Sequence, residues 1–269
     1  MQTNKKKTKK PIEIVSKPYV RGTLFDKTTL SSSLKFFGAL VGMTLAYLFL
    51  GTMLVFDMHW LSMILNAMIL LAALGLFLNN GAGRSVALIT QGEVLHNRRE
   101  SGRKIDPDDE RSCYHPLKGF VNALLGTIPF FVLAVILALT AERQMTSTGT
   151  LPSWIEYYET RPEIGMALQH YHESDQLTLT AACRIVTRMM LMPFVTIVGA
   201  TNFDGLLALE RVSPLLTLLP ALFYGFGYTR GPAMRTAVHT KITDNNRKRA
   251  KREKREQRQR RNNQPEQLN

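Results

Sequence analysis

The stretch FFGALVGMTLAYLFLGTMLVF, from Phe36 to Phe56, contains 21 residues and no charged side chain. A helix needs about 20 apolar residues to cross the hydrocarbon core of a bilayer. Two more blocks have this property, Trp60–Leu78 with 19 residues and Phe120–Ala141 with 22. A soluble domain would have to bury three uncharged helices of this length in one core, so the blocks predict membrane-spanning helices.

The overall composition hides this pattern. The 269 residues are 45% hydrophobic and carry a net charge of +13, and their mean hydropathy is near zero. These averages also fit a soluble protein, but here the charges lie between the apolar blocks and at both ends. The distribution, rather than the average, indicates a membrane protein.

The positive charges are distributed unevenly along the chain. Lys and Arg outnumber Asp and Glu by nine to two in residues 1–35 and by eleven to four in residues 241–269. Residues 142–180 contain only two Lys/Arg against six acids. Because Lys and Arg resist translocation, we expect both termini in the cytoplasm and 142–180 as an outer loop. The expected location is the plasma membrane.

Two apolar segments remain before the basic C-terminal tail, although this topology requires an odd number of further crossings. Segment 182–201 contains two arginines and a proline, whereas 212–229 has no charge but is interrupted by prolines and glycines. We favour 212–229 as a crossing and 182–211 as a re-entrant or interfacial hairpin, and the reverse assignment stays open.

The predicted fold is therefore an all-α polytopic membrane protein with four full crossings plus one re-entrant or interfacial apolar hairpin. A basic N-terminal segment (1–35) and a basic tail (231–269) flank a membrane domain (36–230). The crossings are predicted at about 36–56, 60–78, 120–141 and 212–229.

Small residues predict how the first helices pack. Gly38, Gly42 and Ala46 recur every four residues and form one flat helix face. Only three residues separate the first two apolar blocks, so we expect the first two helices to pack tightly along this face as an antiparallel hairpin. Such faces could also contact other membrane proteins.

Further small residues mark the second and third helices. The run Asn79–Gly83 predicts a C-terminal stop for the second helix. Gly119, Ala123 and Thr127 form a second small-residue stripe on the third helix. We expect this stripe to face a neighbouring helix.

The segment 182–201 contains the charges that most directly suggest a function. Arg184 and Arg188 are four residues apart and project from one helix face. Charged groups at membrane depth are costly and often functional, so this pair is a candidate anion or lipid-headgroup site, with Asp204 and Glu210 as possible partners. Alternatively, both arginines extend to the outer interface and only anchor the helix.

Evidence for catalysis is weak. His170 and His172 point to opposite sides of a helix, and Cys113 with His115 lacks an orienting acid at a defined position. Phosphate-binding glycine loops, the G-x-S-x-G elbow and HExxH are not found in the sequence. We assign no catalytic residue, cofactor or metal, and an enzyme is not favoured.

The tail from Arg247 to Arg261 reads RKRAKREKREQRQRR, with ten Lys/Arg in fifteen residues. It could anchor to anionic lipid headgroups and act as a topology signal, bind RNA or the ribosome, or bind an unidentified protein. We expect a non-enzymatic scaffold or assembly component, and the alternative is a transport or lipid/anion-binding subunit. The candidate surface-binding residues of the tail are Arg247, Lys248, Arg249, Lys251, Arg252, Lys254 and Arg255.

Overall fold

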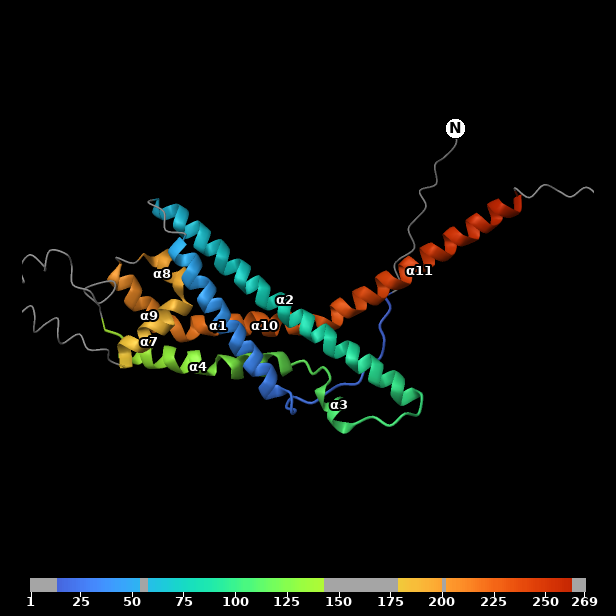
Figure 1. Ribbon diagram of the computed structural model, residues 1–269, viewed down its shortest axis with the longest axis horizontal. Coiled ribbons are helices and arrows are strands. Elements are labelled where there is room, and N and C mark those ends of the chain that lie inside the picture. Colours follow the sequence, from blue (N-terminus) through green and yellow to red (C-terminus); the bar gives the residue numbers. More distant parts are fainter. Residues whose placement is uncertain (1–13, 54–57, 143–178, 200–201, 263–269) are drawn as a thin grey trace, which may run out of the picture.

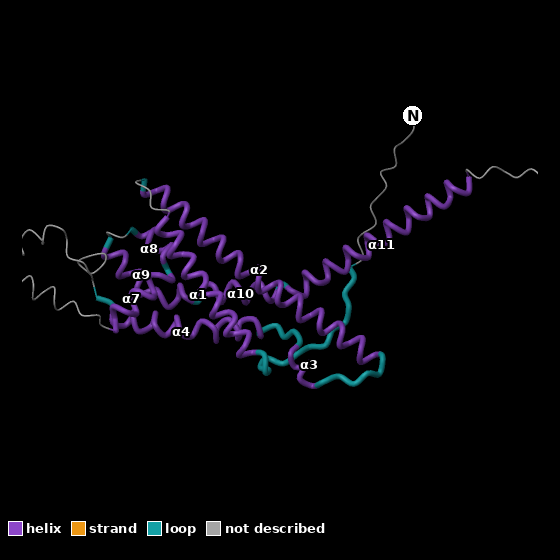
Figure 2. Tube along the Cα trace, in the orientation of Figure 1, coloured by secondary structure: helices purple, strands orange, loops and turns teal. Residues whose placement is uncertain are grey.

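The computed structural model describes residues 14–53, 58–142, 179–199 and 202–262, and within these ranges every regular element is a helix (Figure 2). Four helices are long and apolar enough to cross a membrane, and a further apolar pair is bent. The predicted all-α polytopic class, with four spanning helices and one additional apolar element, is confirmed.

The helices form an elongated bundle (Figure 1). The N-terminal segment, α3 and α11 lie at one end, called here the α3 end, and the opposite end, with α7 and α8, is called the α7 end. The helices are α1 (Thr29–Met53), α2 (His59–Glu100), α3 (Pro107–Ser112), α4 (Lys118–Thr140), α7 (Leu179–Met190), α8 (Met192–Val198), α9 (Phe203–Thr217), α10 (Leu219–Thr229) and α11 (Gly231–Asn262).

The core of the bundle forms around α4 and α10. Helix α2 packs along α10, and α4 packs against α1, α9 and α10. Between membrane-spanning helices, van der Waals contact of the packed side chains stabilises such a core. The main buried cluster contains Phe36, Leu40, Phe77, Ala123, Phe130, Met190 and Ala221.

The expected tight packing between the first two helices is wrong. Helix α1 packs on α4, and the neighbour along α2 is α10. Gly38, Gly42 and Ala46 are exposed, and a Cβ added at either glycine would meet no atom within 4 Å. The small-residue face of α1 is therefore not used inside the described part of the chain.

The predicted stop at Asn79–Gly83 is also wrong, because α2 continues to Glu100. Gly81 serves close packing instead: a Cβ there would overlap the carbonyl oxygen of Tyr224 on α10. In the same way, a Cβ at Gly227 of α10 would overlap the carbonyl oxygen of Leu78. These two glycines let the backbones of α2 and α10 approach closely.

The stripe on the third spanning helix is confirmed. Ala123 and Thr127 of α4 are fully buried, and the Thr127 hydroxyl donates to the Ala123 carbonyl at 2.8 Å. A Cβ added at Gly119 would overlap the ring of Tyr228 on α10. The stripe therefore packs against neighbouring helices, as expected from its residue spacing.

The bent pair consists of α7 and α8, which meet at 90°. Leu191 separates the two helices, and Pro193 lies in the first turn of α8. Helix α7 packs on α4 and α8 packs on α2. Residues 203–211, predicted as part of the hairpin, belong to α9, which leads into α10, so the helical segment that contains the predicted crossing 212–229 begins at Phe203.

Residues 14–28 run in extended form along the α3 end. The Val20 amide donates to the Gly92 carbonyl at 3.1 Å, and the Gly22 amide donates to the Tyr114 carbonyl at 3.0 Å. Val20 is buried in a small apolar cluster with Leu95 of α2. The N-terminal segment is thus docked between α2 and the α3–α4 connection.

Candidate functional site

The two arginines of α7 converge on one carboxylate. Arg184 binds both oxygens of Glu210, with Nε at 2.8 Å from Oε1 and Nη2 at 3.2 Å from Oε2. Arg188 Nη2 lies 2.6 Å from Glu210 Oε1. The Glu210 side chain is only 3% exposed. The structure therefore brings three of the four residues of the predicted site together, with Glu210 at the centre.

The position of this cluster along the bundle limits what it can do. Arg184 Nη2 also donates to the carbonyl oxygen of Glu142 at 3.0 Å, just beyond the end of α4. The cluster therefore lies near the α7 end rather than midway along the bundle. Asp204 is exposed in the first turn of α9, about 9 Å along the helix axis from Glu210.

The Arg184–Glu210–Arg188 cluster, called here the clamp, joins two helices. Guanidinium forks match a carboxylate in geometry and hold it by charge-assisted hydrogen bonds. Two arginines share one glutamate, so the cluster joins α7 to α9 and carries a net charge of +1. A cavity of about 10 Å³ adjoins it, lined in part by Thr187 and Ser213, and is large enough for about one water molecule.

A second buried charge cluster fixes the base of α11. Arg235 Nη2 lies 2.6 Å from Glu93 Oε2 of α2, and His239 Nε2 lies 2.7 Å from Glu93 Oε1. The side chains of Glu93 and His239 are each 8% exposed. Arg235 and His239 are four residues apart, so one face of α11 presents both to the same carboxylate.

Sequence reasoning missed this cluster. Glu93 and His239 are 146 residues apart in the chain, and each lies among many other charges. The i,i+4 spacing of Arg235 and His239 was the only available signal, and it does not identify a partner. The fold creates the site by placing α11 beside α2.

Beyond its base, α11 continues as a helix through the whole basic tail. The seven predicted surface-binding residues are all exposed on it, from Arg247 to Arg255. Figure 1 shows this part of α11 leading away from the bundle at the α3 end. The tail is thus a helical arm attached directly to the last spanning segment; we call residues 247–262 the basic arm.

A third buried pair, Lys118 with Asp26, secures the N-terminal segment. Lys118 Nζ lies 2.7 Å from Asp26 Oδ2 and also donates to the carbonyls of Arg111 and Ser112. Burial raises the pKa of Asp26, but hydrogen bonds from Lys118, Thr29 and Thr28 outweigh this effect, so its pKa is lowered. The ammonium of Lys118 has its donors satisfied, as a buried cation requires.

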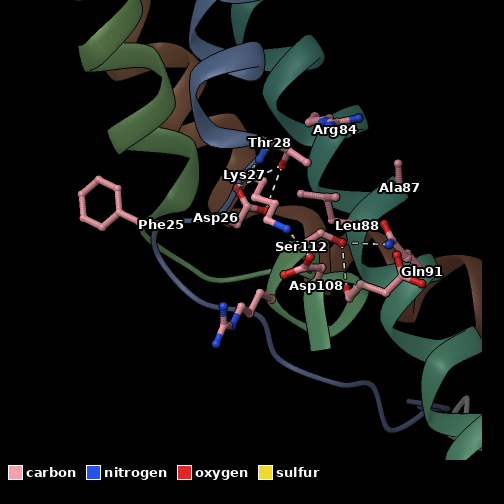
Figure 3. A pocket seen from close by; sticks show the side chains of 12 residues that line it. Phe25, Asp26, Lys27, Thr28, Arg84, Ala87, Leu88, Gln91, Asp108 and Ser112 are labelled. Atoms are coloured by element: carbon pink, nitrogen blue, oxygen red, sulfur yellow. Dashed lines mark hydrogen bonds and ion pairs between the residues drawn. The ribbon is translucent and has the colours of Figure 1, made fainter. Parts of the chain in front are cut away.

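A pocket of about 450 Å³ lies beside this pair, between the N-terminal segment, α2 and α3 (Figure 3). Its polar groups largely bind one another: Lys27 Nζ lies 2.6 Å from Asp108, and Gln91 donates to Ser112 Oγ at 2.9 Å. The pocket therefore has mixed charge and offers no nucleophile paired with a base.

The remaining candidates from the sequence are Cys113 with His115, and His170 with His172. Cys113 is fully buried, and this burial is the main reason that the pKa of its thiol is raised. A raised pKa disfavours the thiolate, which is the nucleophilic form. The His115 ring accepts from the Leu117 amide at 3.3 Å. His170 and His172 lie outside the described residues. Among those described, no group of three or more His, Cys, Asp and Glu could hold a metal ion.

Comparisons with protein-family models, curated proteins and solved structures find nothing that matches this chain.

Proposed function

We propose that this protein is a non-enzymatic integral membrane component of the plasma membrane that presents the basic arm to a polyanion, most specifically RNA, at the cytoplasmic face. The observation that carries the proposal is the attachment of the arm. Helix α11 runs without interruption from Gly231 to Asn262, and Glu93 of α2 holds its base. A basic segment that only sets the membrane topology would not need a second helix to hold its base.

The orientation follows from charge. Residues 1–35 and 241–269 are the two segments richest in Lys and Arg, and the parts of them that the structure describes before α1 and in α11 lie at the α3 end. Because positive charge is retained on the cytoplasmic side, the α3 end is assigned to the cytoplasm. The Arg184–Glu210–Arg188 clamp then lies at the outer side.

The base of the arm stands away from the bilayer in this orientation. Arg84 is the first charged residue after the apolar block of α2, and Glu93 follows nine residues later, about 14 Å further along the helix. Arg247 begins about 12 Å beyond His239 along α11. Measured along the two helices, the basic arm thus starts more than one Debye length, about 8 Å, beyond the end of the apolar block of α2, which supports a partner in solution over the lipid surface.

The composition of the arm favours recognition of phosphates rather than bases. Residues 247–261 contain ten Lys/Arg and no aromatic side chain on which a base could stack. Binding would then neutralise phosphate charges, depend steeply on salt and be nearly independent of sequence.

The transport or anion-binding alternative rests on Arg184 and Arg188. Both are hydrogen-bonded to Glu210, and the cluster lies near the α7 end. This geometry favours a structural clamp over a translocation site.

The test is ultraviolet crosslinking of RNA to the full-length protein in native membranes. One variant replaces the seven surface-binding residues of the arm with Gln. The matched control replaces the lysine cluster at residues 5–10 with Gln, which also removes positive charge from a terminus. We expect RNA crosslinks to fall at least tenfold in the arm variant and to persist in the control.

Unchanged crosslinks in the arm variant, or equal loss in both variants, would contradict the proposal. Loss of binding to anionic vesicles without any change in RNA crosslinks would assign the arm to the lipid surface instead.

A further inference from the structure

Helices α1 and α2 leave a groove between them near the α3 end. Each packs mainly on other helices, and a hollow of about 210 Å³ opens between them. The groove is lined by Lys35, Phe36, Ala39, Phe77, Arg84 and Tyr224.

The two cations mark one end of this groove. Lys35 directly precedes the apolar block of α1, and Arg84 is the first charge after the apolar block of α2. Both are exposed, and neither makes an ion pair or a hydrogen bond with any residue that the structure describes. Ser32 and Asn80 line the same end and add neutral hydrogen-bonding groups.

This arrangement differs from the other charged sites of the protein. Lys118, Arg184 and Arg235 each face a carboxylate. At the groove, two cations from separate spanning helices face one hollow without an acidic lining residue. The site is therefore complementary to an anion that comes from outside the chain.

The rest of the groove is apolar. Phe36 packs against Phe77 and Tyr224, with ring centroids 5.4 Å and 5.1 Å apart, and these rings form its floor. Along α1 the surface continues through Ala39 and Gly42, which are exposed. Ala46 extends this run of small exposed residues by one more turn, so this stretch of α1 offers a hydrocarbon chain a smooth surface.

We propose that the groove binds one anionic phospholipid, with its phosphate between Lys35 and Arg84 and an acyl chain along Phe36, Ala39 and Phe77. The occupant is a lipid rather than a soluble phosphate because the cations lie where the apolar blocks of both helices end, at the expected depth of a headgroup. A cationic end joined to an apolar groove matches both parts of such a molecule. This site is separate from the basic arm and does not depend on it.

The test is native mass spectrometry of the full-length protein with phosphatidylglycerol or phosphatidylcholine as the added lipid. One variant combines Lys35→Ala and Arg84→Ala, and its control combines Arg98→Ala and Arg103→Ala, two exposed cations at the same end. A third variant, Ala39→Phe, narrows the groove and keeps both cations.

The wild-type protein and the control should retain one phosphatidylglycerol in preference to phosphatidylcholine. The double variant should bind phosphatidylglycerol about 30-fold more weakly, because each cation near an anionic lipid contributes about 1 kcal/mol. Ala39→Phe should also weaken binding. Retention by the double variant would overturn the proposal. Inorganic phosphate that displaces the lipid at equal concentration, with no effect of Ala39→Phe, would assign the site to a soluble anion and also overturn it.

Discussion

Release of the basic arm by the substitution Glu93→Ala is the most informative perturbation of this structure. Glu93 is the carboxylate that both Arg235 and His239 contact, and its side chain is 8% exposed. Apolar support is limited on this part of α11, where Met234, Val238 and Ile242 are 42–50% exposed. The charge cluster should therefore supply much of the free energy that docks α11 on α2.

The size of the effect follows from the burial of the cluster. Removal of one partner from a buried ion pair costs about 3–5 kcal/mol, and Arg235 keeps 21% of its side chain exposed, so we expect about 3 kcal/mol. This value shifts the docking equilibrium by about 150-fold. Gln257 lies 26 residues beyond Gly231, about 39 Å along the helix, so a swing of 20° at the base would move it by about 14 Å.

The assay is pulsed electron paramagnetic resonance between spin labels at Asn97 of α2 and Gln257 of α11, both exposed. The two native cysteines are buried and should not react with the label in the folded protein. The wild-type protein should give a narrow distance distribution, and Glu93→Ala should broaden it by more than 10 Å, on the scale of the swing above.

Two further variants sharpen the result. Glu93→Gln keeps hydrogen-bond acceptance from Arg235 but loses the charge, so it should give intermediate broadening. Glu110→Ala removes a partly exposed carboxylate at the same end, whose pair with Arg99 contributes little. A narrow distribution in Glu93→Ala, or equal broadening in Glu110→Ala, would refute the role of Glu93.

The remaining predictions concern stability. Glu210→Ala leaves two arginines without their carboxylate and should lower the free energy of unfolding by about 3 kcal/mol in a detergent-denaturation titration; loss of less than about 1 kcal/mol would count against the clamp. The pKa of Asp26 is lowered in the folded protein. Its pair with Lys118 therefore stabilises the fold fully at pH values above the pKa of the carboxyl in the unfolded chain, about 3.9. This stabilisation is lost as the pH falls through the lower pKa of the folded protein. Thermal unfolding of Asp26→Asn should therefore depend less on pH below 4 than that of the wild-type protein, and an unchanged dependence would contradict the pairing. Gly227→Ala should destabilise by about 1–3 kcal/mol because the new Cβ overlaps a carbonyl oxygen of α2, whereas Gly38→Ala should be nearly neutral; equal effects would contradict the packing described.

The spanning helices could be predicted from the sequence because a bilayer imposes a length on uncharged segments. The four blocks of apolar residues correspond to α1, α2, α4 and the α9–α10 segment. The partnership of Arg184 and Arg188 with Glu210 also followed from the high cost of charge among apolar residues. In both cases the residues concerned lie close together in the sequence.

Predictions that required knowledge of helix neighbours were less successful. Glycine is compatible with a helix stop, with close packing and with an open face, and local sequence does not distinguish these roles. Gly81 packs against α10 inside a continuous helix, whereas Gly38 faces no described neighbour. Likewise, Glu93 could not be matched with His239 before the fold placed α2 beside α11.

The central claim is that the basic arm stands in solution rather than on the lipid surface. The most direct measurement is the accessibility of a spin label at Gln257 to a water-soluble nickel chelate and to oxygen, in nanodiscs of phosphatidylcholine with and without phosphatidylglycerol. We expect high nickel accessibility and low oxygen accessibility, both independent of the anionic lipid. A label that becomes shielded from nickel and exposed to oxygen when phosphatidylglycerol is added would place the arm in the headgroup layer and contradict a position in solution.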